Sequence, residues 1–380
     1  MSAGWTVTTD DLESIAIGAG ILGTGGGGNP YIGKLAARRA MGEGHSVEVV
    51  PLEAYPDDGL VCTVGGMGAP TNTVEKITRG TETLEALRVL ERHVGRPFSA
   101  VIPAEIGGGN SVEPLLVAAR SGLPVLDGDG MGRAFPEMPM ITYFIYGVSC
   151  YPCAVVDDKG NEVLFPSGVD AAWLERLSRG SAVLMGGHAG CAVAVMSGAD
   201  VKRTAIAGTL SKARDLGSAV RRARAAGEDV ISTILEVTGG RRLFQGKIVD
   251  VERRTTAGWV SGRVHLDGVG DDRGSSMEIA FRNENLAAWH DGRPVAMVPD
   301  LICICHADDG EPVTTELLRY GFRVAVLWID CDEKLKTPEA LAVVGPRSFG
   351  LDLDYVAGVQ TSPPAGSIPP EETIAGKEAS

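Results

Sequence analysis

The sequence predicts an α/β N-terminal domain with a mostly parallel sheet, followed by an α+β, β-rich C-terminal domain. Apolar strands alternate with helices over residues 47–126, which is typical of a parallel sheet covered by helices. Short β-type runs separated by Gly- and Asp-rich turns fill residues 243–329. A chain of 380 residues also exceeds what one hydrophobic core usually serves. We predict domains at 1–168 and 169–358, and a disordered tail at 359–380.

The N-terminal domain opens with a helix over residues 8–17, because Thr8, Thr9, Asp10 and Asp11 are typical helix-start residues. Periodicity then predicts a helix over 34–41, strands over 47–52 and 60–64, a helix over 81–94, a strand over 99–103, a helix over 111–121 and a strand over 123–126. A turn at 157–161 predicts a hairpin near the end of this domain.

The C-terminal domain begins with a largely helical stretch over 201–237. Strands are predicted over 247–251, 259–266, 277–281 and 324–329. The last twenty residues are rich in Pro, Ser, Glu and Ala and almost free of large apolar side chains. Such a composition predicts disorder.

The net charge argues against two classes of partner. Lys and Arg number 35 and Asp and Glu 49, so the formal charge of −14 repels nucleic acid and anionic membrane surfaces. Residues 181–199 carry no formal charge, but their Ala, Gly and Ser content favours a buried segment of a soluble core over a membrane span. Seven cysteines and a start without a cationic leader favour reduced thiols and a cytoplasmic location.

Glycine is unusually abundant, with 51 of 380 residues. The stretch Gly18-x-Gly20-x-x-Gly23 matches a dinucleotide-binding pattern, but a predicted helix precedes it where that pattern needs a strand. Thr24 follows, and then four glycines, Gly25, Gly26, Gly27 and Gly28. Their backbone N–H groups would bind an anionic or carbonyl-bearing ligand. Alternatively, they form a tight turn where two chain segments cross.

Two polar loops follow neighbouring predicted strands. Glu105, three glycines and Asn110 follow the strand over 99–103, and Asp127 and Asp129 follow the next strand. Ligands of parallel sheets bind beyond the carboxyl ends of the strands. Two aspartates at this spacing can converge on a cation or share a proton, and Arg133 can hold a substrate carboxylate. The alternative is turn or cap chemistry, since Asp-Gly is a common turn pair.

Cysteine and histidine offer weaker candidates. Cys150-x-x-Cys153 and Cys303-Ile-Cys305 supply zinc-type ligands without forming a paired array, and the second segment has the pattern of a buried strand. His188 lies between glycines and is either a ligand or proton carrier, or a packed histidine with one hydrogen bond. No Gly-x-Ser-x-Gly elbow occurs, which disfavours a serine hydrolase.

These motifs resemble a known family. The glycine run 23–28, the segment 105–110 and Asp127-x-Asp129-Gly-Met-Gly-Arg133-Ala-Phe-Pro-Glu137 look like the N-terminal domain of the S-methyl-thiohydantoin desulfurase-like family. Segments 282–285, 299–302 and 345–350 look like its C-terminal domain. The resemblance covers residues 10–357. It implies hydrolytic removal of sulfur from a thiohydantoin ring, in a family associated with hydantoinase and oxoprolinase-type enzymes.

We therefore expect a hydrolase for a small cyclic amide, acting as a homo-oligomer with a possible hydantoinase-type partner. The candidate catalytic residues are Glu105, as general base, with Asp127 and Asp129. A zinc-activated water would be held by Asp127, Asp129 and His188. The candidate substrate-binding residues are Gly25, Gly26, Gly27, Gly28, Asn110, Arg133 and Glu137. The competing hypotheses are a non-catalytic binding subunit of a hydantoinase or oxoprolinase-type system and, more weakly, a nucleotide-dependent ligase or kinase.

Overall fold

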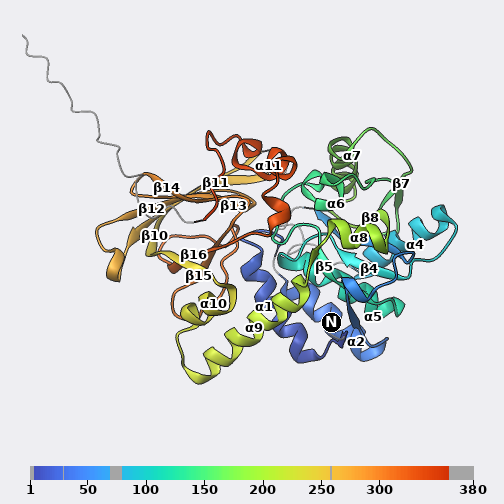
Figure 1. Cartoon of the computed structure of the whole chain (residues 1–380), viewed down its shortest axis with the longest axis horizontal. Helices are drawn as coiled ribbons and strands as arrows, with labels where there is room; N and C mark the ends of the chain where they lie inside the picture. The colour runs from blue at the N-terminus through green and yellow to red at the C-terminus, as the bar shows by residue number, and fades with distance from the viewer. Residues whose placement is uncertain (1–3, 29, 69–78, 257–258, 359–380) are drawn as a thin grey trace, which may run out of the picture.

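The computed structural model describes residues 4–28, 30–68, 79–256 and 259–358. The chain forms two lobes, each built on its own sheet (Figure 1). Helices α1 (Thr9–Leu22) and α9 (Thr209–Ala226) pack together beside the junction of the lobes (Figure 1). The tail predicted at 359–380 lies outside the described residues.

The first sheet has the predicted parallel core. Its order is β1-β2-β5-β4-β3-β8-β6-β7, with β9 paired to β5. Strands β2, β5, β4 and β3 are parallel, and the other strands pair antiparallel. The bounds are β1 Trp5–Thr6, β2 Glu48–Pro51, β3 Leu60–Gly68, β4 Ala100–Pro103, β5 Val125–Asp129, β6 Cys153–Val156, β7 Glu162–Phe165, β8 His188–Ser197 and β9 Ile206–Ala207.

Two of these strands run further than predicted. β3 continues to Gly68 because residues 65–68 pair with β8, and β5 continues to Asp129 because its end pairs with β9. Both pairing partners come from beyond residue 168, so the first sheet uses chain from both sides of that point. Local patterns could not show this extension, since the pairing strands are remote in sequence.

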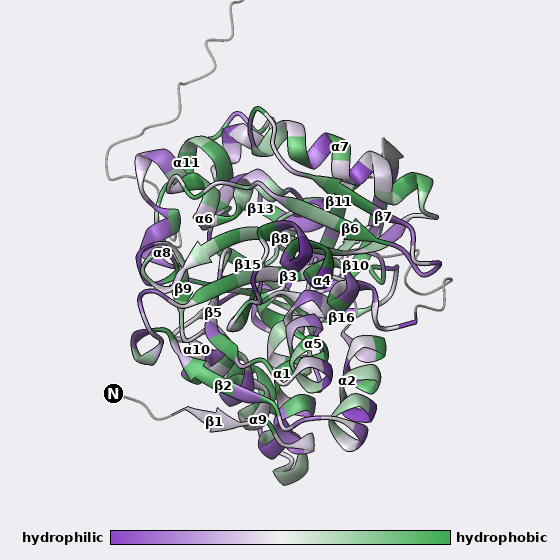
Figure 2. Cartoon of the chain, turned by 90° about the vertical axis from the view of Figure 1, so that its right-hand side faces the viewer, coloured by the Kyte–Doolittle hydropathy of each residue, from purple (hydrophilic) through white to green (hydrophobic). Residues whose placement is uncertain are grey.

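Helices cover the first sheet and join it to the second. The other α-helices of the described residues are α2 Tyr31–Glu43, α4 Glu82–Val94, α5 Glu113–Ser121, α6 Thr142–Ile145, α7 Ala171–Leu184, α8 Gly198–Thr204, α10 Val230–Thr238 and α11 Pro338–Val344. Figure 2 shows helix α4 in front of strands β3 and β8, whose ribbons carry much hydrophobic colour, with α5 and α2 below these strands.

Helix α1 extends through the glycine motif that the sequence places after it. A Cβ on Gly18 would lie 1.9 Å from the carbonyl oxygen of Ala213, and one on Gly217 would lie 1.8 Å from that of Ser14. Both pairs join α1 to α9. The glycines therefore allow two helices to cross backbone to backbone, and the dinucleotide-like spacing is a consequence of helix packing.

The second lobe is the predicted β-rich unit. Its antiparallel sheet has the order β14-β13-β12-β11-β10-β16-β15. The bounds are β10 Arg241–Thr256, β11 Trp259–Gly268, β12 Ser276–Arg282, β13 Glu284–His290, β14 Arg293–Met297, β15 Leu301–His306 and β16 Arg323–Ile329. Phe244, Ile279 and Val326 are among its fully buried core residues.

The uncharged segment 181–199 becomes the end of α7 and the strand β8. β8 lies between β3 and β6 in the middle of the first sheet, and most of its side chains are buried. Within the described part of the chain, no helix combines the length and apolar character needed to cross a bilayer.

Candidate functional site

A cavity of about 210 Å³ lies at the carboxyl ends of β3 and β4, where the two lobes meet. Its walls come from the glycine run, the end of β3, the loops after β4 and β5, and the turn between β12 and β13. This is the edge of a parallel sheet at which ligands bind. The lining residues used below are Gly27, Gly28, Gly66, Glu105, Asn110, Phe135, Glu137, His188, Asn283 and Glu284.

Glu105 is the buried carboxyl on the first-lobe side of the cavity, and its side chain is held by two donors. The Nδ2 of Asn110 donates to Oε1 at 2.7 Å, and the N–H of Phe135 donates to Oε2 at 3.2 Å. Burial raises the pKa of Glu105 to about 8, although both hydrogen bonds act in the opposite direction. The carboxyl is therefore poised to exchange a proton near neutral pH.

The two glycine-rich segments touch through their backbones. A Cβ on Gly27 would lie 2.4 Å from the oxygen of Gly107, and the N–H of Gly109 donates to the oxygen of Gly27 at 2.8 Å. Gly27 has a φ of +73°, which also favours glycine. Gly27 and Gly28 line the cavity.

Gly25 and Gly26 face the second lobe. The oxygen of Gly25 accepts the N–H of Thr315 at 2.9 Å, and a Cβ on Gly26 would lie 2.1 Å from Oε1 of Glu284. Neither glycine is among the residues lining the cavity. Part of the glycine run therefore packs closely against other chain segments, as one of the two alternatives requires. Gly27 and Gly28 also border the cavity, and ligand binding by their N–H groups stays a prediction.

Asp127 and Asp129 lie on β5 and serve local structure. Asp127 accepts the N–H of Ser211 at 3.1 Å and its hydroxyl at 2.6 Å, which fixes the first turn of α9. Asp129 Oδ2 accepts the backbone N–H groups of Ile106, Met131 and Gly132. Burial raises the pKa of Asp129 to about 7. Neither aspartate is among the described residues that line the cavity.

Arg133 is fully buried and binds the second lobe. Its guanidinium donates to the backbone oxygens of Asp300 at 2.6 Å, Pro299 at 3.2 Å and Asn285 at 2.9 Å, and to the hydroxyl of Thr24 at 2.8 Å. The guanidinium N–H groups that we expected to bind a substrate carboxylate therefore already donate to these acceptors. Arg133 is also not among the lining residues.

His188 and Glu137 do border the cavity. His188 begins β8, and its Nε2 lies 3.1 Å from the position that a Cβ would take on Gly66. Glu137 pairs with Arg282 of the second lobe at 2.9 Å. His188 therefore lies on the Asn110 side of the site, whereas Asp127 is engaged with α9.

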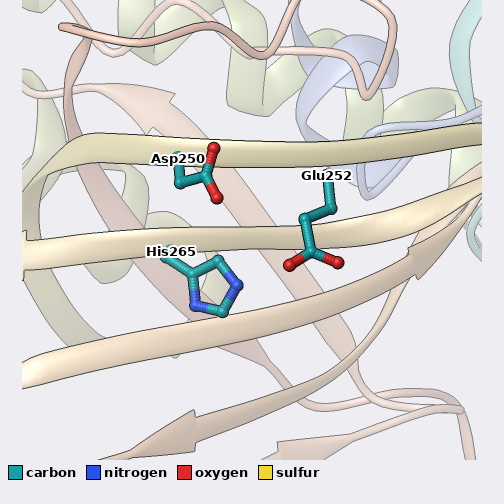
Figure 3. A group of neighbouring side chains, drawn as sticks. All are labelled: Asp250, Glu252 and His265. Carbon is teal, nitrogen blue, oxygen red and sulfur yellow. The ribbon is translucent and has the colours of Figure 1, made fainter.

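Two other groups of described residues bring metal-type ligand atoms together. Asp250 and Glu252 on β10 and His265 on β11 project from neighbouring strands with their polar ends close together (Figure 3). Asp300, Asp330 and Cys331 form the second group. Neither group contains Asp127, Asp129 or His188, and neither lines the cavity. Cys303 and Cys305 lie buried on β15, as the strand pattern predicts.

Sequence reasoning missed Glu284 as a site residue. It comes from the second lobe, is 3% exposed, and lines the cavity. Its Oε2 has no hydrogen-bond partner among the described residues. Burial, and then the negative charge of Glu105, raise the pKa of Glu284 well above its usual range. The only sequence signal was the family-like segment 282–285, which carries no chemical pattern of its own.

Carboxyl groups dominate the charge of the cavity. Among the described lining residues one arginine, Arg179, faces six glutamates, and it is paired with Glu175. The six are Glu82, Glu105, Glu113, Glu137, Glu175 and Glu284. Because this arginine is already paired, the described lining offers little positive charge to a phosphate or carboxylate, so the site favours an uncharged or cationic ligand.

A crystal structure of a protein from Chromobacterium violaceum has the same fold. It superposes with a TM-score of 0.79 at 24% sequence identity, covering 93% of this chain and 99% of that one. Among curated proteins, no relative matches the chain. Residues 10–167 match the S-Me-THD-like N-terminal domain and residues 169–357 match the S-Me-THD-like C-terminal domain, so the chain belongs to the S-Me-THD-like family.

Proposed function

We propose that the protein is a hydrolase that removes sulfur from a thiohydantoin or S-methyl-thiohydantoin ring. The observation that carries the proposal is Glu105, a buried carboxyl with a pKa of about 8 in a cavity between the two lobes. A general base works best when its pKa lies near the working pH. Family membership directs this chemistry toward thiohydantoin-like rings.

The charge of the cavity supports an uncharged ring as substrate. A hydantoin-type ring carries amide N–H and carbonyl groups and no phosphate or carboxylate. Protonated Glu105 and Glu284 can donate to ring acceptors, and the same carboxyls accept from ring N–H groups when ionised. The absence of an unpaired cation among the described lining residues also disfavours the nucleotide-dependent alternative.

The reaction needs one water molecule. Glu105 takes a proton from the water as its oxygen forms a bond with the ring carbon that carries sulfur. The carbon–sulfur bond then breaks, and the carbon keeps the oxygen as a carbonyl. In the S-methyl form one proton leaves with the sulfur and one goes to the ring nitrogen, whereas in a thiohydantoin both protons leave with the sulfur. A thiohydantoin thus gives hydantoin and hydrogen sulfide, and its S-methyl form gives hydantoin and methanethiol.

Zinc activation of the water is the alternative form of this mechanism. It requires Asp127, Asp129 and His188 to meet, but the oxygens of Asp127 already accept hydrogen bonds from Ser211. We therefore assign water activation to Glu105. Whether zinc takes part is tested directly. Metal analysis of the purified protein, with turnover measured before and after chelation, separates the two forms.

A panel of hydantoins, thiohydantoins and S-methyl-thiohydantoins tests the proposal, with release of sulfide or thiol as the readout. We expect turnover by the wild type and a loss of about 100-fold or more in Glu105→Gln. Binding of these rings without any turnover would instead support the non-catalytic subunit of a hydantoinase or oxoprolinase-type system. No binding and no turnover would refute both.

We further propose a cytoplasmic homo-oligomer. All seven cysteines are free and buried, which suits a reducing compartment. Trp173, Leu177 and Leu184 on α7 are exposed apolar residues, and exposed apolar side chains are frequent at subunit contacts. The molar mass in solution, with and without a hydantoinase-type partner, tests the assembly.

A further inference from the structure

We infer that Glu284 is a second catalytic residue, the acid that protonates the departing sulfur. The inference rests on the proposed function and adds a residue from the other lobe. The base would come from the loop after β4, and the acid from the first residue of β13. The catalytic site would then be complete only where the two lobes are in contact.

The start of β13, which carries Glu284, is held by hydrogen bonds within the second lobe and packs against the first lobe. Asn283 has a φ of +56°, and its N–H donates to the oxygen of Val260 at 2.7 Å. The hydroxyl of Thr315 donates to the oxygen of Asn283 at 2.6 Å. The side chain of Glu284 then packs against Gly26, where any Cβ would collide with its carboxyl. Glu284 thus lines the cavity from the second lobe while its carboxyl packs against the glycine run.

The surroundings of Glu284 favour the protonated form. Glu105 and Arg133 face it from the first lobe, and Glu316 faces it from its own lobe. Burial and the two acids disfavour its ionisation, whereas Arg133 favours it. Its buried Oε2 accepts no hydrogen bond from described residues. Glu105, by contrast, accepts two hydrogen bonds that stabilise a carboxylate. When Glu105 and Glu284 together hold a single proton, that proton therefore resides on Glu284.

This distribution gives a balanced step. Glu105 removes one proton from the attacking water, and Glu284 gives one proton to the sulfur as the carbon–sulfur bond breaks. The second proton of the water leaves to solvent as the carbonyl forms, and solvent returns one proton to the ring nitrogen of the S-methyl form or to the sulfur of the thiohydantoin. The oxygen–carbon bond replaces the carbon–sulfur bond, and no oxidant or reductant is needed. Transfer of the proton from Glu105 back to Glu284 through solvent restores the pair.

A leaving-group series tests the role of Glu284. S-methyl-thiohydantoin expels a basic thiolate that needs a proton, whereas the S-(4-nitrophenyl) analogue expels a weakly basic thiolate that does not. We expect Glu284→Gln to lower kcat/KM about 100-fold or more for the methyl substrate and less than about 10-fold for the aryl one. Glu105→Gln should lower both to a similar extent, because the water must be activated in each case.

The pH profile provides a second readout that a merely structural role would not move. In the wild type kcat/KM should fall at alkaline pH as the acid ionises, and Glu284→Gln should lose that falling limb. Glu278→Gln is the control, because Glu278 pairs with Arg263 on the second sheet, lies outside the cavity lining and is not among the groups that face Glu284. It should keep wild-type rates on both substrates, and all variants are compared by thermal unfolding.

An equal loss on both substrates in a folded Glu284→Gln, or an unchanged rate, would overturn the inference while leaving the proposed function intact. An inactive wild type across the whole panel would instead overturn the proposed function. The two failures are therefore distinguishable.

Discussion

The side chain of Asn110 donates to Glu105 Oε1 at 2.7 Å, while its own oxygen accepts the N–H of Gly66 at 2.7 Å. One amide thus ties the end of β3 to the candidate base. Because Asn110 donates to the carboxylate, it favours the ionised form of Glu105. Asn110 is best described as a positioning residue that also borders the substrate cavity.

Replacing Asn110 should move the acid limb of the pH–rate profile. In Asn110→Ala the pKa of Glu105 should rise above its value of about 8, because a hydrogen bond that favours the carboxylate is lost. Each unit of upward shift should lower the rate on the acid side about tenfold. The measurement is kcat/KM against pH.

Asn161→Ala serves as the control, since Asn161 donates to Asp157 in the turn between β6 and β7, outside the cavity lining. An acid limb that stays in place in folded Asn110→Ala would rule out this role.

Arg133 should contribute to the stability of the two-lobed fold. Arg133→Met leaves the backbone oxygens of Asn285, Pro299 and Asp300 without their donor. We expect the free energy of unfolding in urea to fall by about 3–5 kcal/mol, the usual result of breaking a buried charged network. Arg88→Met removes a half-exposed guanidinium paired with Glu91 and should cost less than about 1 kcal/mol. Equal effects of the two changes would contradict this assignment.

The sequence predicts the strands of the parallel core because long apolar runs show where both faces of a strand are buried. It does not predict that α1 continues past Gly18, since that depends on contact with Ala213 far along the chain. Glycine has no side chain whose hydropathy could mark a helix face. Packing glycines and ligand-binding glycines therefore look alike until their neighbours are known.

The site is only partly predictable for a related reason. The position of Glu105 at the cavity follows from its place after a parallel strand. Asp127 and Asp129 have a similar place in the sequence, but the structure turns Asp127 toward α9 and uses Asp129 to hold loops. Glu284 reaches the cavity from the second sheet, and no local pattern shows which loop of one lobe meets the other. The catalytic roles assigned to these residues remain predictions.

Asp127 offers a direct test of its structural role. Asp127→Ala removes the acceptor of the Ser211 N–H and hydroxyl at the start of α9. We expect a stability loss of about 0.5–2 kcal/mol, as for the loss of a helix cap, with turnover and metal content unchanged. Urea unfolding, the desulfurisation assay and metal analysis check the three quantities. A large loss of activity in a folded variant would instead support a catalytic role for Asp127.

The raised pKa values of Glu105 and Asp129 also predict how stability depends on pH. In the folded protein these values are about 8 and about 7, whereas free carboxyls have a pKa of about 4. Below about pH 4 both groups are protonated in the folded and unfolded states, so their contribution to stability is fully present. As the pH rises further, the unfolded chain loses these protons first and the folded protein retains them. The unfolded state then binds fewer protons, so stability must fall until the folded groups ionise at about pH 7 to 8.

We therefore expect the free energy of unfolding to decline between pH 5 and pH 8, by at most about 1.4 kcal/mol per pH unit for each group. Asp129→Asn and Glu105→Gln mimic the protonated forms and should each flatten the decline. Asp157→Asn is the control, because the pKa of Asp157 is lowered by its turn hydrogen bonds and it changes stability only at more acidic pH. Urea titrations at each pH measure the slope.

If the stability of Asp129→Asn and that of the wild type declined equally with pH, Asp129 would have to be ionised in the folded protein at neutral pH. The three backbone N–H groups on its Oδ2 would then outweigh its burial.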